Sequence, residues 1–239
     1  MKIQTLLNSS RMMMFENELE GFDYSAHGTA FLCFYHQQLY AVTAGHVIGS
    51  YDAEALRVMI HPEVREFLPH NAQVTLVSAE QDDPDYADLA ILPIELTMFD
   101  QRCFRDSPPF DLSEQLVNST PPPTGKLVFR GFPSDKSGIN FDTAKIKVQP
   151  VILEGDRVGR APMAHCHVMR LRDVSHCSTL DGFSGSPVFW ISNQDPTRKE
   201  YRFAGVLIKG TYVSKTAYYV EAEVLMRALN KISSTSRTD

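Results

Sequence analysis

Ser184 stands in the stretch DGFSGSPVFW, residues 181–190, where glycines lie close to it on both sides. Glycine permits backbone conformations and close approaches that other residues forbid. Pro187 then opens a β-branched and aromatic run that predicts a buried strand. The stretch therefore predicts a tight turn that presents a hydroxyl. Such a hydroxyl becomes a nucleophile only when a positioned base removes its proton.

His46 is the candidate base. The eight histidines stand at positions 27, 36, 46, 61, 70, 165, 167 and 176. Only His46 ends an apolar strand inside a turn of small residues, AVTAGHVIG, although a histidine at a strand end can also be purely structural. Histidines 36, 61 and 70 lie in polar or proline-flanked stretches, where solvent exposure explains them.

Asp88 is the candidate carboxylate that orients the base. In QDDPDYADLAIL, Asp82, Asp83 and Asp85 lie in a predicted turn, where water solvates them. Asp88 is embedded in an apolar strand, where a charge is costly unless it has a partner. A carboxylate, an imidazole and a hydroxyl together can carry out nucleophilic acyl transfer.

Short strands separated by turn signals must position these three residues. We expect strands at 28–35, 39–43, 56–60, 73–77, 88–94, 126–130, 144–148, 165–171, 188–191 and 203–208. The first two flank His36-Gln37-Gln38 as a hairpin, and Val224, Leu225, Ala228, Leu229 and Ile232 recur at helical spacing near the end. Residues 105–125 carry five prolines and predict a connection between two all-β halves, each a small barrel or sandwich.

Composition limits the possible functions of the chain. It has 239 residues and a net charge of −6, which argues against a nucleic-acid surface. No run of 18 apolar residues predicts a membrane span, and the N-terminal segment does not read as a secretory signal. Four cysteines (33, 103, 166 and 177) are too few to staple a domain of this size. We therefore expect a cytoplasmic protein with reduced thiols.

Three segments together resemble one family, the chymotrypsin-like (trypsin-fold) serine peptidases. They are TAGHV around His46, ADLAIL around Asp88 and GFSGSPV around Ser184, in that family's chain order. The resemblance covers roughly residues 25–232 and extends to VFRGFP, FAGVLIKG and the closing helix. The α/β-hydrolase elbow fails because position 186 is serine and no histidine follows Ser184, and a subtilisin-type order would need Asp23 as its aspartate.

The resemblance implies an all-β fold of two six-stranded β-barrels of chymotrypsin type packed together, with a short C-terminal helix. Its expected divisions are an N-terminal segment at 1–24, a first barrel at 25–110, a Pro-rich connector at 111–125, a second barrel with the helix at 126–232, and a polar tail at 233–239.

The resemblance also implies a role for each site residue. Ser184 would attack a peptide carbonyl, His46 would act as general base and acid, and Asp88 would hold the imidazole. The backbone N–H groups of Gly182 and Ser184 would form the oxyanion hole. The expected activity is that of a serine endopeptidase acting on polypeptides, without cofactor or metal.

Four positions depart from the family pattern. Phe183 replaces the aspartate that pairs with a newly cut N-terminus in digestive members, and Val47 replaces a disulfide cysteine. Ser186 replaces a glycine, and Ile208 replaces a serine that supports the catalytic aspartate. The chain is thus more similar to intracellular and bacterial trypsin-like peptidases, including those related to the Deg/HtrA group.

By the same resemblance, Ser178 would floor the primary substrate pocket, and Lys209 and Gly210 would lie on its wall. Ser178 is uncharged, which favours an apolar or small substrate side chain, whereas Lys209 could recruit an acidic one; Asp181 lies nearby. His165, Cys166, His167, His176 and Cys177 include zinc-ligand types, but their spacing matches no closed structural site, and pocket-lining or core roles are expected.

Two alternatives to an active peptidase remain. One is a catalytically inactive protease-fold module for binding or scaffolding, which would be expected to have lost a triad member. The other is an esterase, because the acyl-transfer machinery is the same. A cytoplasmic peptidase needs restraint, so we also expect a regulatory partner or cognate substrate protein.

Overall fold

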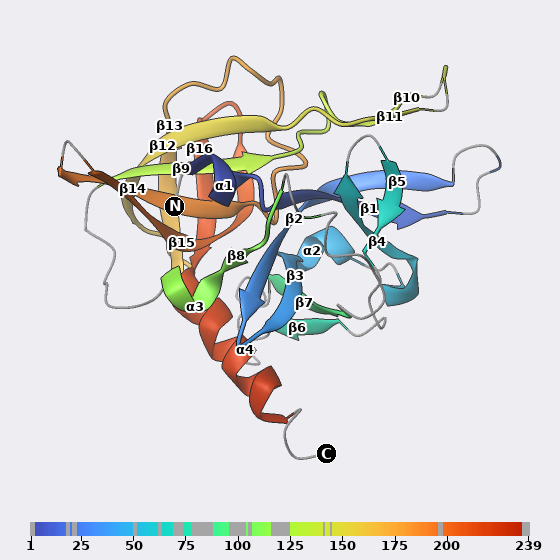
Figure 1. The fold of residues 1–239 in the computed structure, drawn as a ribbon. Coiled ribbons are helices and arrows are strands. Elements are labelled where there is room, and N and C mark those ends of the chain that lie inside the picture. The colour runs from blue at the N-terminus through green and yellow to red at the C-terminus, as the bar shows by residue number, and fades with distance from the viewer. Residues whose placement is uncertain are drawn as a thin grey trace.

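The computed structural model describes residues 3–17, 20, 23–49, 52–61, 64–68, 74–77, 88–95, 104, 107–115, 125–140, 142–143, 145–195 and 198–235. Most of them lie in two β-rich halves, with a helix at the C-terminal end (Figure 1). The expectation of an all-β fold in two halves with a closing helix is confirmed; where two six-stranded barrels were expected, the described strands form one closed six-stranded barrel and one curled eight-stranded sheet. Asp82, Asp83, Asp85, His70, Cys103 and most of the Pro-rich connector and polar tail fall outside the described residues.

The first half is a curled sheet of eight strands. Its order is β5-β4-β1-β2-β3-β7-β6, and β8 pairs in parallel with β2. The strands are β1 (Ser10–Glu16), β2 (Tyr24–Tyr35), β3 (Gln38–Ala44), β4 (Leu56–His61), β5 (Val64–Phe67), β6 (Thr75–Val77), β7 (Leu89–Ile94) and β8 (Phe110–Asp111). Short helices α1 (Ile3–Leu7), α2 (Gly45–Ile48), η1 (Ala53–Ala55) and α3 (Leu112–Gln115) accompany them.

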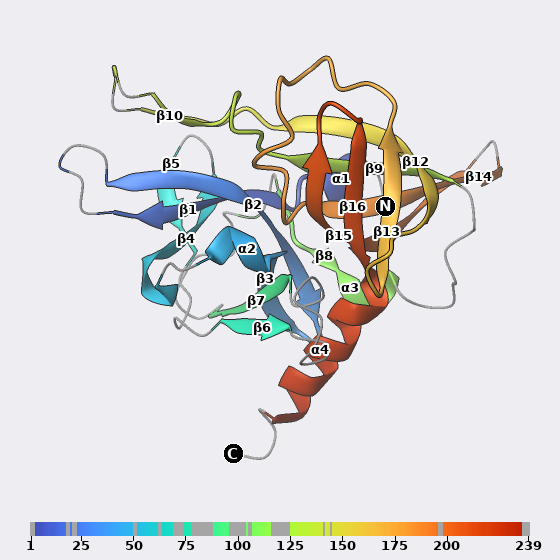
Figure 2. The ribbon, with the colours of Figure 1, turned by 180° about the vertical axis from the view of Figure 1, so that it is seen from behind.

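The second half is a closed six-stranded barrel. Its order is β12-β13-β16-β15-β14-β9, and β10 and β11 form a separate two-stranded hairpin (Figures 1 and 2). The strands are β9 (Lys126–Gly131), β10 (Gly138–Asn140), β11 (Lys145–Lys147), β12 (Val151–Arg160), β13 (Cys166–Leu171), β14 (Pro187–Asp195), β15 (Arg198–Thr211) and β16 (Thr216–Glu221). Helix α4 (Ala222–Thr235) follows directly.

The predicted hairpin around residue 36 is confirmed. Tyr35 pairs with Gln38, so His36 and Gln37 alone form the turn that joins β2 to β3. Both turn residues have positive φ, +47° and +68°. Two-residue turns with positive φ at both positions match the twist of the flanking strands. The turn therefore delivers β3 in register beside β2.

The sheet of the first half begins earlier in the chain than residue 25. β1 pairs with β2 along its whole length and with β4 at Met13, Met14 and Phe15. These three side chains are fully buried. The apolar run RMMMF is therefore a sheet element and not a leading segment.

A cluster of phenylalanines joins the two halves. The ring of Phe110 stacks on Phe31 with centroids 5.6 Å apart and meets Phe189 edge-on at 5.4 Å. Phe203 lies 5.6 Å from Phe31. Phe31 and Phe110 come from the first half, and Phe189 and Phe203 from the barrel. Aromatic pairs add to the stability that burial alone gives, so this contact holds the halves together.

Helix α4 packs across both halves. Leu225 and Leu229 are fully buried in the same core cluster as residues of β2 and β15. The hydroxyl of Tyr35, on β2, donates a hydrogen bond of 2.6 Å to the Asn230 side chain. Among the described residues, no helix has both the length and the apolar character to cross a bilayer.

Replacing Leu225 with alanine should lower the free energy of unfolding by about 3 kcal/mol, because the substitution leaves a cavity where α4 meets the core. Urea unfolding followed by circular dichroism measures the change. The exposed Glu223→Gln on the same helix is the control and should shift stability by no more than about 0.5 kcal/mol. Equal midpoints for the two variants would contradict the packing described for α4.

Candidate active site

Asp88 holds the ring of His46. Asp88 immediately precedes β7, and His46 lies in the single turn α2 that follows the neighbouring strand β3. His46 Nδ1 lies 2.9 Å from Asp88 Oδ1 and 2.8 Å from Oδ2, and the backbone N–H of His46 donates to Oδ1 at 2.8 Å. An ionised carboxylate only accepts hydrogen bonds, so it fixes the proton on Nδ1. Nε2 then carries the lone pair of a base.

This pair is partly open to solvent. The side chain of His46 is 51% exposed and that of Asp88 is 20% exposed. The backbone N–H of Gly45 donates to the Asp88 carbonyl at 2.8 Å, which ties the turn to the start of β7. The Asp88 carboxylate therefore has the expected hydrogen-bond partner, His46, and the exposed imidazole of His46 remains accessible to a ligand.

Ser184 lies in the turn that leads into β14. Its hydroxyl donates a hydrogen bond of 3.0 Å to the carbonyl of Ile208 on β15. Among the hydrogen bonds of the described residues, none joins the Ser184 hydroxyl to His46. The Cα–Cβ bond of Ser184 must therefore rotate, and turn the hydroxyl away from the Ile208 carbonyl, before the hydroxyl could give its proton to the imidazole.

The turn of Ser184 packs against β2 of the other half. Thr29 N–H donates to the Ser184 carbonyl at 3.0 Å. A Cβ on Gly28 would lie 3.0 Å from the Val47 side chain and 3.3 Å from the Ser184 carbonyl oxygen. Gly28 thus stands between the turn of His46 and the turn of Ser184. The structure brings these two segments of the chain to the same strand.

Gly185 is required by this contact. Its φ is +89°, and a Cβ there would lie 1.8 Å from the Thr29 carbonyl oxygen and 2.4 Å from the Thr43 hydroxyl. Only glycine allows both the conformation and the approach. The expectation that glycine beside Ser184 permits a close approach of another chain segment is confirmed.

The loop of Gly182 packs against the residues that directly follow β9. Gly182 has φ +90°, and a Cβ there would lie 2.4 Å from the Phe132 carbonyl oxygen. Ser134 N–H donates to the Asp181 carbonyl at 2.9 Å. The glycine that the sequence analysis assigns to the oxyanion hole is thus held in a conformation that other residues rarely adopt.

Thr29 is a site residue that sequence reasoning missed. Its hydroxyl donates to the Gly182 carbonyl at 2.7 Å and accepts from the Phe132 N–H at 3.0 Å. The side chain is fully buried and cannot reach water, so the hydroxyl depends on these two hydrogen bonds. The available signal was one hydroxyl in the apolar strand GTAFLCF, which did not reveal its partners.

Phe183 packs into the barrel core. Its side chain is fully buried and meets Phe129 edge-on with centroids 5.4 Å apart. The expectation that Phe183 lies in apolar surroundings is confirmed. Ser186, which replaces a family glycine, is also buried, and its hydroxyl donates to the Phe183 carbonyl at 2.6 Å. The substituted serine therefore adds a hydrogen bond inside this turn.

Ser178 is bonded to a carboxylate that the sequence analysis did not identify. Its N–H and its hydroxyl both donate to Asp135 Oδ2, at 2.6 and 2.7 Å. Burial acts to raise the pKa of Asp135, but the hydrogen bonds from Ser178 and the nearby Lys136 outweigh it, so the pKa lies below its ordinary value. The region expected to be neutral therefore contains a negative charge, because the loop after β9 folds onto Ser178.

Gly210 and Lys209 face different surroundings. A Cβ on Gly210 would lie 2.7 Å from Leu180 Cδ1, so Leu180 covers this glycine. The Lys209 amine lies 3.8 Å from Met163 Sδ and 5.3 Å from the centroid of the Tyr218 ring. The structure thus places Gly210 beside the segment of Ser178, while the Lys209 amine lies over β16.

The histidine and cysteine cluster divides into two parts. His165 Nδ1 and His167 Nε2 both contact the Glu221 carboxylate, the latter at 3.2 Å. His176 lies apart, 3.8 Å from Asp173, and the sulfurs of Cys166 and Cys177 belong to buried residues. Within the described ranges, no three such side chains converge as metal ligands. His165, which precedes β13, and His167, on β13, instead contact Glu221, the last residue of the neighbouring barrel strand β16.

Comparison with solved structures defines the class of fold. The structure of the Vibrio cholerae VesB protease superposes with a TM-score of 0.59 at 13% sequence identity. The match covers 95% of this chain and 64% of the VesB chain, less than two thirds of that protein. At this identity the likeness concerns the fold, which is the chymotrypsin fold.

The amino-acid sequence assigns the chain to a family. Residues 28–194 match the family described as the trypsin-like peptidase domain. The matched range contains His46, Asp88 and Ser184, and it spans the junction between the two halves. The chain belongs to this family, whose members are typically serine endopeptidases. No curated protein matches the chain in sequence.

Replacing Gly185 with alanine should lower the free energy of unfolding by several kcal/mol, because the new methyl group would overlap the Thr29 carbonyl at a positive φ. Gly159→Ala is the control, since a Cβ there meets nothing within 4 Å. Chemical denaturation of both variants measures the difference. If Gly185→Ala were as stable as Gly159→Ala, the described contact between the Ser184 turn and β2 would be wrong.

Proposed function

We propose that this protein is a serine endopeptidase that uses His46, Asp88 and Ser184 as its catalytic triad. The observation that carries the proposal is the pairing of the Asp88 carboxylate with both the ring and the backbone of His46. The position of Ser184 also supports the proposal, because the turn of Ser184 and the turn of His46 both contact the same strand, β2. The family match makes polypeptides the expected substrates.

The proposed reaction begins with rotation of the Ser184 hydroxyl away from the Ile208 carbonyl. His46 Nε2 takes the hydroxyl proton while the oxygen attacks a peptide carbonyl. The imidazolium then gives that proton to the leaving amine, and an acyl-enzyme remains on Ser184. Water attacks the acyl-enzyme by the same route, with His46 again as base. Asp88 stabilises the imidazolium at each stage.

The oxyanion of each tetrahedral intermediate would be bound by the N–H groups of Gly182 and Ser184. Gly182 is suited to this task because the Phe132 carbonyl packs against it and the Thr29 hydroxyl donates to its carbonyl, which together hold its positive φ. Donors that are fixed before the reaction need no reorganisation, and loss of one costs on the order of 10²–10³ in rate. The proposed chemistry uses protein groups alone and needs no cofactor.

Ser178, Gly210 and Lys209 are proposed to bind the substrate side chain. Asp135 changes the expected character of this pocket, because its carboxylate accepts a hydrogen bond from Ser178. The pKa of Asp135 lies below its ordinary value, so the carboxylate is ionised at neutral pH. A neutral apolar pocket is therefore less well supported than a polar one.

We propose the cytoplasm as the compartment of this protein. Three described cysteines, Cys33, Cys166 and Cys177, are buried free thiols, and a reducing compartment keeps thiols in this state.

A catalytically inactive binding module is the second candidate. The observation that favours it is the Ser184 hydroxyl, which is bonded to Ile208 and not to His46. A fluorophosphonate probe separates the two candidates, because it labels only a serine that a base can activate. Degradation of an unfolded protein then separates a peptidase from an esterase.

Ser184→Ala should reduce cleavage of an unfolded protein substrate by roughly four to six powers of ten, with the fold retained. His46→Ala should behave similarly, and the double variant should lose little more, because triad residues act as a unit. Turnover measured on purified proteins tests this. Activity near the parent level in Ser184→Ala would rule out the assignment.

The full-length chain should react with the fluorophosphonate without prior cleavage, because Phe183 anchors the loop by packing and not by an ion pair with a new N-terminus. The intact mass of the labelled species checks that residues 1–239 are all present, and Ser184→Ala controls for labelling elsewhere. Labelling that appears only after N-terminal processing would contradict the packing account. Labelling that requires a second protein would also contradict it and would favour control by a partner.

A further inference from the structure

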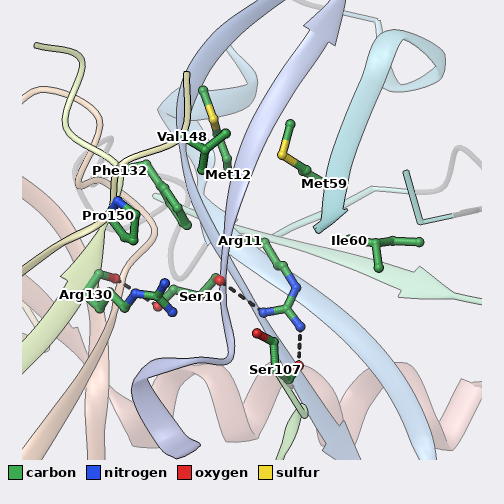
Figure 3. A pocket seen from close by; sticks show the side chains of 10 residues that line it. All are labelled: Ser10, Arg11, Met12, Met59, Ile60, Ser107, Arg130, Phe132, Val148 and Pro150. Carbon is green, nitrogen blue, oxygen red and sulfur yellow. Dashed lines mark hydrogen bonds between the residues drawn. The ribbon is translucent and has the colours of Figure 1, made fainter. Parts of the chain in front are cut away.

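A cavity of about 100 Å³ lies between the first sheet and the end of β9 (Figure 3). One wall is apolar and is made by Met12, Met59, Phe132 and Val148. None of the residues proposed for catalysis lines it. An apolar cavity of roughly 150 Å³ holds a benzene-sized molecule. A cavity of 100 Å³ therefore has room for a small group with a short apolar stem.

Arg130 supplies a cation at the other end of this cavity. It lies on β9 and is half-buried, and burial lowers the pKa of its guanidinium, which nevertheless stays protonated. Nη1 donates to the Leu7 carbonyl at 3.3 Å and to the Asn8 side chain at 3.1 Å. The carbon of the guanidinium lies 5.8 Å from the centroid of the Phe132 ring.

These contacts of Arg130 are all with neutral groups. Within the part of the chain that the structure describes, no carboxylate is bonded to it. A guanidinium has five N–H donors, and Nη1 accounts for two of them. Among the hydrogen bonds of the described residues none uses Nε or Nη2, so these two groups can bind a planar acceptor with two oxygens. A half-buried cation without a counter-ion is favourably completed by an anion.

Arg11 adds a second guanidinium to the same end of the cavity. Its side chain is only 4% exposed, and Nη1 donates to the carbonyls of Asn8 and Ser10 at 2.6 and 3.0 Å. Nη2 donates to the Ser107 carbonyl. Figure 3 shows both arginines at the opposite end from the methionines. The cavity is therefore cationic at one end and apolar at the other.

We propose that this cavity is a binding site for a small carboxylate with a short apolar stem. The carboxylate binds Arg130 through two parallel N–H···O bonds, the geometry that a guanidinium favours. The stem contacts Met12, Met59 and Phe132, and methionine adapts to stems of different shape. A doubly charged phosphate fits less well, because the apolar wall would desolvate it without giving it further donors.

Titration calorimetry of butyrate into the full-length Ser184→Ala protein tests the proposal, because that background removes the proposed nucleophile. Saturable binding of butyrate is expected. Butyramide, which has nearly the same shape without the charge, should bind about tenfold more weakly or worse. Butylammonium should not bind.

Three variants locate the site. Arg130→Met removes the guanidinium and should weaken butyrate binding about tenfold or more. Val148→Phe fills the cavity, leaves the contacts of Arg130 with Leu7 and Asn8 in place, and should abolish binding even if Arg130→Met proves unstable. Arg172→Met is the control, because Arg172 is exposed and pairs with Asp156 elsewhere on the barrel, and it should bind as the parent does.

The proposal is overturned if the parent shows no saturable butyrate binding, if butyramide binds equally well, or if Val148→Phe retains the parent affinity. The titration reads binding alone. Its failure is therefore separate from failure of the proposed peptidase activity.

Discussion

The buried hydroxyl of Thr29 joins the parts of this molecule on which the candidate site depends. It donates to Gly182 and accepts from Phe132, while the backbone N–H of the same residue binds the Ser184 carbonyl. The Thr29 carbonyl in turn accepts from the Thr43 hydroxyl at 2.7 Å. One residue of β2 thus connects the strand before His46, the end of β9 and the loop around Ser184. The bonds with Phe132 and Thr43 are buried and the bond with Gly182 is partly buried, so breaking one of them would leave a poorly solvated polar group unsatisfied.

The same loop is held from its other side by packing. Phe183 fills space in the barrel core that Gly131 leaves open, since a Cβ there would lie 2.6 Å from the Phe183 ring and 2.4 Å from the Ser186 hydroxyl. Burial of a phenylalanine contributes about 1.5–3 kcal/mol and needs no charged partner. An apolar anchor of this kind forms together with the barrel. The loop therefore has an apolar anchor at the position where the sequence resemblance implies an aspartate in digestive serine peptidases.

Much of the fold could be predicted from local sequence. The hairpin around residue 36, the strand at β7 and helix α4 carry clear turn or periodicity signals, and the structure has them where they were expected. β12 was missed although Val151 and Leu153 are buried in alternation with exposed neighbours, because Gly155 and Gly159 interrupt the run. β1 was missed because its residues are buried on both faces and show no alternation. β16 was missed because its short run follows a tight turn and borders the helix.

The sequence alone determined the residue types for acyl transfer, their order along the chain and the glycines that the Ser184 turn requires. These features are local, because spacing and backbone freedom are properties of a short segment. Only the tertiary structure showed that Thr29 supports the loop, that Asp135 is bonded to Ser178 and that Glu221 gathers His165 and His167. It also placed Arg130 and Arg11 at one end of a cavity. Each of these contacts joins residues far apart in the chain, and their meeting depends on strand pairing and barrel closure, which local patterns do not encode.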